Sequence, residues 1–167
     1  MDLNFFNKIR ILDGGMGQQL LAHGLLSKGT LWSTSAILDE KYHKLVIDIH
    51  LSFINSGAEV IVTNTFSSRK LRLIQNNVDH KFKYVNEKAC LLSIEAKELS
   101  KKNILIAGSL PSQTDTYVED DRDTKKIESD FYEQAEIIGP YVDFLYLDVI
   151  SSGREIDLAS NVATKFN

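Results

Sequence analysis

The stretch that decides the fold is residues 9–17, Ile-Arg-Ile-Leu-Asp-Gly-Gly-Met-Gly. A short apolar run ends in the carboxylate of Asp13, and a glycine-rich turn then leads into an amphipathic segment. This order is typical of a buried strand that delivers a polar side chain to the rim of a sheet before the chain turns. The stretch therefore predicts a buried strand followed by a helix.

The same pattern recurs three times along the chain. Apolar runs at 60–62, 104–107 and 144–147 each end in polar residues, which are Thr63-Asn64-Thr65, Gly108-Ser109 and Asp148. Four strands in regular alternation with helices predict an α/β fold with a parallel sheet and right-handed crossovers. The polar residues all follow the carboxyl ends of strands, where such folds bind ligands. Two architectures fit this pattern: an open doubly wound sheet, or half of an eight-stranded barrel.

The helices expected between these strands have recognisable ends. Asp39 and Gly57 are typical of the start and the end of one helix, and Asn76-Asn77 divide the next helical segment in two. Further helices are expected over 16–23, 125–138 and 155–164. The second piece of the divided segment carries an apolar stripe, made of Phe82, Val85, Ala89, Leu92, Ala96 and Leu99. The loop 111–124 contains an acidic run, 119–121, which we expect to be solvated.

Composition excludes several classes of protein. A length of 167 residues with 43% hydrophobic residues suits one domain with a core. The net charge of −4, without a basic block, gives no electrostatic case for nucleic acid. No apolar stretch approaches the roughly 20 residues of a membrane helix, and the N-terminus does not resemble a signal peptide. The single cysteine, Cys90, is compatible with a reducing compartment, so we expect a cytoplasmic protein.

Two acids, Asp13 and Asp148, follow predicted strands and are the first candidates for a site. If their strands share one sheet, both carboxylates lie at the same end of that sheet, where they could hold an amino group or move protons. The alternative is that one of them caps a helix or pairs with a basic residue. A dinucleotide site is disfavoured, because Leu20 stands where the glycine fingerprint needs its third glycine.

No metal site is expected in this chain. The histidines lack the spacing of metal ligands, and we expect all four at the surface or on helix flanks: His23, His43, His50 and His80. Cys90 adjoins the apolar stripe of a helix, and we expect it to be a small buried thiol rather than a ligand.

Five segments, taken in order, resemble the homocysteine S-methyltransferase family, which includes betaine- and S-methylmethionine-dependent enzymes. They are Leu12-Asp13-Gly14-Gly15-Met16-Gly17, Leu31-Trp32-Ser33, Val62-Thr63-Asn64-Thr65-Phe66, Ala107-Gly108-Ser109-Leu110-Pro111, and Asp148 with Ser151-Ser152 and Glu155. The resemblance implies a (β/α)8 TIM-type barrel, which typically needs about 250 residues. Residues 1–167 would then be a single partial homocysteine-binding domain, the first four β-α units without the C-terminal half of the barrel.

The resemblance also implies an activity. The family transfers a methyl group from a small donor to the sulfur of homocysteine, which gives methionine and belongs to methionine biosynthesis. Zinc is expected for the family, but its three cysteine ligands lie in the second half of the barrel and not in this chain. The residues that would bind the substrate are Asp13, Gly14, Gly15, Trp32, Asn64, Thr65 and Asp148.

The partners implied are homocysteine, a methyl donor, and either a complementary half-barrel chain or a second copy of this one. Two other functions stay open. The chain could be a non-catalytic truncated remnant or an assembly subunit that keeps the half-barrel. It could also be an unrelated doubly wound domain that binds a small molecule.

Overall fold

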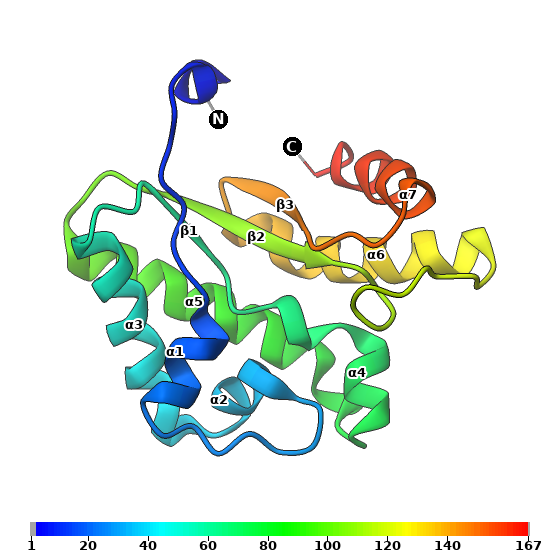
Figure 1. Ribbon diagram of the computed structural model, residues 1–167, viewed down its shortest axis with the longest axis horizontal. Helices are drawn as coiled ribbons and strands as arrows, with labels where there is room; N and C mark the ends of the chain where they lie inside the picture. The colour runs from blue at the N-terminus through cyan, green and yellow to red at the C-terminus, as the bar shows by residue number, and fades with distance from the viewer. Residues whose placement is uncertain (1–2, 167) are drawn as a thin grey trace.

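Three parallel strands form the centre of the fold in the computed structural model, which describes residues 3–166 (Figure 1). They are β1 (Val60–Val62), β2 (Leu105–Pro111) and β3 (Phe144–Asp148), in the spatial order β1-β2-β3. Val60 pairs with Leu105, and Ala107 pairs with Phe144. The α/β class and the parallel sheet agree with the prediction. Residues 1, 2 and 167 of the expected domain lie outside the described part of the chain.

The predicted first strand is not a strand. Only Leu12 forms a parallel bridge, to Val60, and the backbone N–H of Asp13 donates to the carbonyl oxygen of Val60 at 3.0 Å. The segment thus runs beside β1 (Figure 1) for about two residues. The expectation that it is buried is wrong, because Ile9 is 97% exposed and Ile11 is also exposed. Only Leu12 of its apolar side chains is more than half buried. The described part of the chain thus has three strands and one bridge instead of four strands.

Seven α-helices connect the strands within residues 3–166. They are α1 (Met16–Ala22), α2 (Ser35–Leu38), α3 (His43–Asn55), α4 (Lys70–Gln75), α5 (Phe82–Ser100), α6 (Thr124–Ile138) and α7 (Gly153–Ala163). The predicted helix ends are confirmed at Gly57 and Asn77, which take φ values of +109° and +57°. Asp39 is also a cap, but of the 3-10 turn Glu40–Tyr42 that precedes α3, where it accepts from the N–H of Lys41.

The helices pack on the sheet through three apolar clusters. One joins α1, α2, α3 and α5 around Leu20, Val46 and Val85, and another joins α6 and α7 to the sheet around Phe131. In the third cluster, Ile61 of β1 and Ile106 of β2 pack the sheet against α3 and α5. The predicted stripe of α5 is buried as expected at its four central positions, whereas its last member, Leu99, is exposed.

The sheet also has an open side. Leu12 and Tyr146 are 41% and 36% exposed, and every residue of β3 keeps some solvent contact. Strand β2, by contrast, is buried from Ile106 to Pro111. The solvent-accessible part of the sheet is therefore β3 and the Leu12 segment, while the central strand β2 is covered up to its carboxyl end.

The acidic run 119–121 is not simply a solvated loop. Asp120 is buried, and its Oδ2 lies 2.6 Å from Nη2 of Arg122, while Nη1 of Arg122 lies 2.8 Å from Oδ2 of buried Asp130. Burial raises the pKa of Asp120, but the hydrogen bonds from Arg122 outweigh it and lower that pKa. The expectation is therefore wrong for Asp120, because spacing did not indicate that Arg122 turns back onto it, whereas Glu119 and Asp121 are exposed as expected.

No helix within residues 3–166 combines the length and apolarity that crossing a membrane requires.

Candidate functional site

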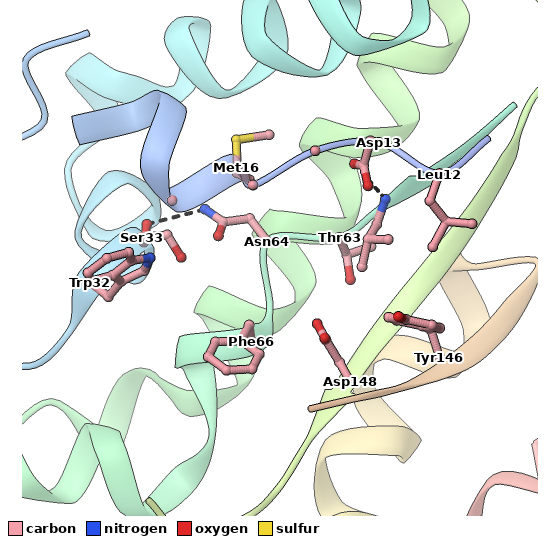
Figure 2. Close-up of a pocket in the computed structure, with 14 residues that line it drawn as sticks. Leu12, Asp13, Met16, Trp32, Ser33, Thr63, Asn64, Phe66, Tyr146 and Asp148 are labelled. Atoms are coloured by element: carbon pink, nitrogen blue, oxygen red, sulfur yellow. Dashed lines mark hydrogen bonds between the residues drawn. The ribbon is translucent and has the colours of Figure 1, made fainter. Parts of the chain in front are cut away.

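A cavity of about 270 Å³ opens at the carboxyl ends of the strands (Figure 2). Its walls come from the turn before α1, from the segment around Trp32, and from the ends of β1 and β3. Six of the seven predicted residues line it: Asp13, Gly14, Gly15, Trp32, Asn64 and Asp148. Small-molecule sites in proteins are concave and carry a few placed polar groups, and this cavity has that character.

Asp13 is the more deeply buried of the two acids, with a side chain that is 4% exposed. Its Oδ2 accepts a hydrogen bond of 2.9 Å from the backbone N–H of Val62, which fixes the carboxylate at the end of β1. Burial raises the pKa of Asp13 to about 7, with a smaller contribution from the negative charge of Asp148, and the backbone hydrogen bonds oppose this rise. Asp13 therefore changes its charge near neutral pH.

Asp148 reaches the same cavity from the end of β3 (Figure 2). Its Oδ2 accepts a hydrogen bond of 2.7 Å from the hydroxyl of Ser109 on β2. Burial raises the pKa of Asp148 as well, and the Ser109 hydroxyl opposes that shift. Two partly desolvated carboxylates on one cavity favour a cationic ligand, because a positive charge stabilises the ionised form of both.

His50 lies directly behind Asp13, which the sequence did not predict. The imidazole is fully buried, its Nε2 lies 3.2 Å from the hydroxyl of Ser93, and its Nδ1 lies 4.0 Å from Oδ2 of Asp13. Burial lowers the pKa of His50 to about 4, so the ring is neutral at physiological pH. The placement of His50 at the surface was wrong. Its spacing of four residues from both Val46 and Ile54 was the available signal, because those residues mark the buried face of α3.

Two glycines, Gly14 in the turn and Gly17 at the start of α1, are required by close contacts. A Cβ on Gly17 would stand 1.8 Å from Nε1 of Trp32, and a Cβ on Gly14 would stand 2.8 Å from Cε1 of Phe53. The start of α1 therefore packs its backbone directly against the indole, which lines the cavity. This contact explains why the glycine-rich segment and Trp32 occur together in one site.

The end of β1 contributes Asn64 but not Thr65. Asn64 is buried, donates from Nδ2 to the carbonyl oxygen of Ser33 at 3.2 Å, and lines the cavity (Figure 2). The hydroxyl of Thr65 points instead to the carbonyl oxygen of Ser109 at 2.7 Å. Thr65 thus joins β1 to β2 behind the site, and the expectation that it lines the mouth is not met. Tyr146 does line the cavity, and its position two residues before Asp148 on one strand face was the signal for it.

The described residues do not fit a zinc ion. Within residues 3–166, no group of three or more His, Cys, Asp or Glu side chains could hold a metal. Cys90 is fully buried in α5, as predicted, and burial raises the pKa of its thiol to about 12. A thiol of that pKa stays protonated at neutral pH and is a poor metal ligand.

Comparison with known proteins points to one family. The profile of the homocysteine S-methyltransferase family matches residues 10–166. An S-methylmethionine–homocysteine S-methyltransferase, BHMT2, from Pongo abelii is 30% identical over 149 residues, which are 89% of this chain and 38% of that protein. Homocysteine S-methyltransferase 2 from Saccharomyces cerevisiae is 29% identical over 77 residues, 41% of this chain and 24% of that protein.

Solved structures show the same fold. The oxidized form of the homocysteine methyltransferase MmuM from Escherichia coli superposes with a TM-score of 0.83 at 21% identity. The superposition covers 98% of this chain and 61% of MmuM. The chain thus covers well under half of the two sequence relatives and about three fifths of the structural one. Because the family profile spans almost the whole sequence, this chain belongs to the homocysteine S-methyltransferase family.

Proposed function

We propose that this chain is the amino-acid-binding half of a homocysteine S-methyltransferase. The observation that carries the proposal is the pair of desolvated carboxylates, Asp13 and Asp148, on one small cavity. The α-ammonium group of homocysteine supplies the positive charge that such a pair favours. The backbone of Gly14 and Gly15, together with Asn64, would orient the carboxylate end of the amino acid.

In the reaction proposed, a methyl group moves from an onium donor to the thiolate sulfur of homocysteine. A new S–CH3 bond forms, the donor's bond to that methyl breaks, and its electron pair stays on the donor atom, which becomes neutral. The residues of this chain bind and orient the amino acid for that step. No metal-dependent step is assigned to them, since they do not fit zinc.

The architecture proposed is the first four β-α units of a (β/α)8 barrel, one partial domain over residues 1–167. The bridge at Leu12 supports it, because it places the first segment beside β1, where the first strand of such a barrel would lie. The likeness in fold to MmuM over 98% of this chain is consistent with it. We also assign the protein to the cytoplasm and to methionine biosynthesis, which its family and its single reduced cysteine support.

A second candidate is a non-catalytic remnant or a half-barrel assembly subunit. It is favoured by the lack of a metal-binding group within residues 3–166 and by the exposed apolar segment around Ile9 and Ile11. Such a chain would keep the amino-acid cavity without methyl transfer. The purified chain alone is therefore expected to bind homocysteine but to show no transfer, whereas the first proposal expects transfer once a complementary half-barrel is added.

The binding proposal is tested by calorimetric titration of the full chain with homocysteine and with 4-sulfanylbutanoate, which lacks the amino group. We expect homocysteine to bind and the analogue to bind at least about tenfold more weakly, the loss typical of a charge-assisted hydrogen bond. Asp13→Asn, which lacks one of the two acids, is expected to lose part of this preference, and Asp157→Asn, on the exposed side of α7, is the control for a lost carboxylate. Equal affinity for both compounds would contradict the assignment of the acids to an amino group.

A further inference from the structure

Behind Asp13, on the side away from the cavity, lies a histidine that the proposed function does not use. Asp13 lines the cavity (Figure 2), whereas His50 of α3 is fully buried and does not line it. Nδ1 of His50 lies 4.0 Å from Oδ2 of Asp13 and has no hydrogen-bond partner among residues 3–166. A buried polar atom without a partner is rare and costly. One ring nitrogen thus faces the acid without a bond to it.

The other ring nitrogen indicates which tautomer His50 adopts in this structure. Nε2 lies 3.2 Å from Oγ of Ser93 on α5, and the hydroxyl of Ser93 donates to the carbonyl oxygen of Ala89 at 3.0 Å. A serine hydroxyl has one proton to donate, so its oxygen accepts from the N–H at Nε2. In the neutral ring, Nδ1 is then the unprotonated nitrogen, and its lone pair faces Asp13.

This tautomer suits a neutral Asp13 and not an ionised one. A lone pair beside a carboxylate repels it, whereas a ring N–H in the same place donates a charge-assisted hydrogen bond. The imidazole can supply that N–H without a change of its own charge, by carrying its proton on Nδ1 instead of Nε2. Ser93 would then turn its hydroxyl from Ala89 to Nε2. The bond to Oδ2 of Asp13 requires the two side chains to approach by about 1 Å.

We propose that His50 is a positioning residue for Asp13, and that its imidazole changes tautomer when homocysteine binds and ionises this acid. The inference rests on the function proposed above. In the bound state, the N–H groups of His50 and Val62 hold the carboxylate from behind, and the ammonium group of homocysteine contacts it from the cavity. The protons balance: the carboxyl group loses one, Nδ1 gains one and Nε2 gives one up, so one proton leaves for the solvent.

The charges around this pair allow the two groups to be followed separately. Asp148, across the cavity, adds to the rise in the pKa of Asp13. Burial lowers the pKa of His50 to about 4. Lys44 and Asp48, on the outer face of α3, lie 2.7 Å apart and pair with each other. Between about pH 5.5 and about pH 8.5, His50 therefore stays neutral while Asp13, with a pKa of about 7, changes its charge.

The test is nitrogen NMR of the wild-type chain, which distinguishes a protonated ring nitrogen from an unprotonated one. The free chain at about pH 5.5 is expected to carry the proton of His50 on Nε2. Addition of homocysteine at about pH 6.5, or a rise to about pH 8.5 without it, should move the proton to Nδ1. His43 is the internal reference, because its Nε2 lies 2.9 Å from the carbonyl oxygen of Ile37, which can only accept. A His50 that keeps one tautomer throughout overturns the inference.

Two substitutions of similar shape then separate the donor from the packing of the ring. His50→Leu removes the group that faces Asp13, and His50→Asn keeps an amide that can donate to it or accept from it. In calorimetry, His50→Leu is expected to bind homocysteine about 10- to 100-fold more weakly than the wild type, the range of a hydrogen bond to a charge, and His50→Asn to recover part of this loss. His23→Leu, at the exposed end of α1, is the control. Equal losses in His50→Leu and His50→Asn, or none in His50→Leu, overturn the inference.

The same titrations distinguish this inference from the function on which it rests. If the wild type fails to bind homocysteine, the proposed function is wrong, and the pH series alone decides whether His50 follows the charge of Asp13. If homocysteine binds and His50 keeps its tautomer, only the role of His50 is wrong. The NMR experiments use the wild-type chain, so they hold even if a His50 variant does not fold.

Discussion

Replacement of Asp13 by asparagine is expected to stabilise the folded chain at high pH while it removes the charge that the substrate needs. The amide of asparagine can still accept the hydrogen bond from the N–H of Val62, so the shape of the site is kept. What changes is the ionisation. The pKa of Asp13 rises from 3.8 in the unfolded chain to about 7 in the folded chain.

The sign of the effect follows from proton binding. Between pH 3.8 and about 7 the folded chain holds a proton on Asp13 that the unfolded chain has lost, so stability falls as the pH rises through this window. Each pKa unit corresponds to about 1.4 kcal/mol, so the cost approaches about 4 kcal/mol at pH 8 but is only about 1.5–2 kcal/mol at pH 5. Asparagine avoids this cost at every pH. The stability gained by Asp13→Asn is therefore expected to grow by about 2–3 kcal/mol from pH 5 to pH 8.

The assay is urea unfolding of wild type and Asp13→Asn at both pH values, followed by the fluorescence of Trp32. The difference between the two proteins is the informative quantity, because the pH dependence contributed by His50 is common to both and cancels. Asp157→Asn is the matched control, and its difference in stability from the wild type is expected to stay the same from pH 5 to pH 8. A difference between wild type and Asp13→Asn that stays constant from pH 5 to pH 8 would refute the argument that burial raises the pKa of Asp13.

Three further outcomes are expected. Gly17→Ala should weaken homocysteine binding at least about tenfold in calorimetry, because its Cβ would displace the indole of Trp32, whereas Gly153→Ala, which has nothing within 4 Å, should bind normally. Arg122→Met should lower the unfolding free energy by about 2–4 kcal/mol, since it leaves buried Asp120 unpaired, and a change below about 0.5 kcal/mol would argue against that pair. The purified chain should self-associate in sedimentation velocity, because its first segment exposes apolar side chains beside an unpaired edge; a monodisperse monomer with one sharp thermal transition would contradict this.

Local patterns were sufficient to predict most of the fold. The apolar runs 60–62 and 144–147 became β1 and β3, and Gly57 ended a helix as expected, because these features depend on neighbours in sequence. The run 104–107 became the start of β2, which continues through Gly108 and Ser109 to Pro111 instead of ending before them. The run at 9–13 failed for a different reason. A strand needs a partner on each buried side, and periodicity does not report whether the fold supplies one.

The two acids of the site could be predicted from the sequence, whereas the residues that contact them could not. Asp13 and Asp148 meet at one cavity because parallel strands all end at the same edge. The contact between His50 and Asp13 depends on how α3 packs against the segment before α1. The spacing of His50 from Val46 and Ile54 indicates that it lies on the buried face of α3, but not which residue it lies behind.

The most direct test of the account is the pKa of Asp13 itself, measured from the carboxyl carbon signal by NMR with and without homocysteine. The free chain is expected to show a pKa near 7, because the carboxylate is buried. Bound homocysteine should lower that pKa by about one unit or more, since its ammonium group stabilises the ionised acid. A pKa near 4 in the free chain, or a value that homocysteine leaves unchanged, would contradict the claim that Asp13 holds the amino group of the substrate.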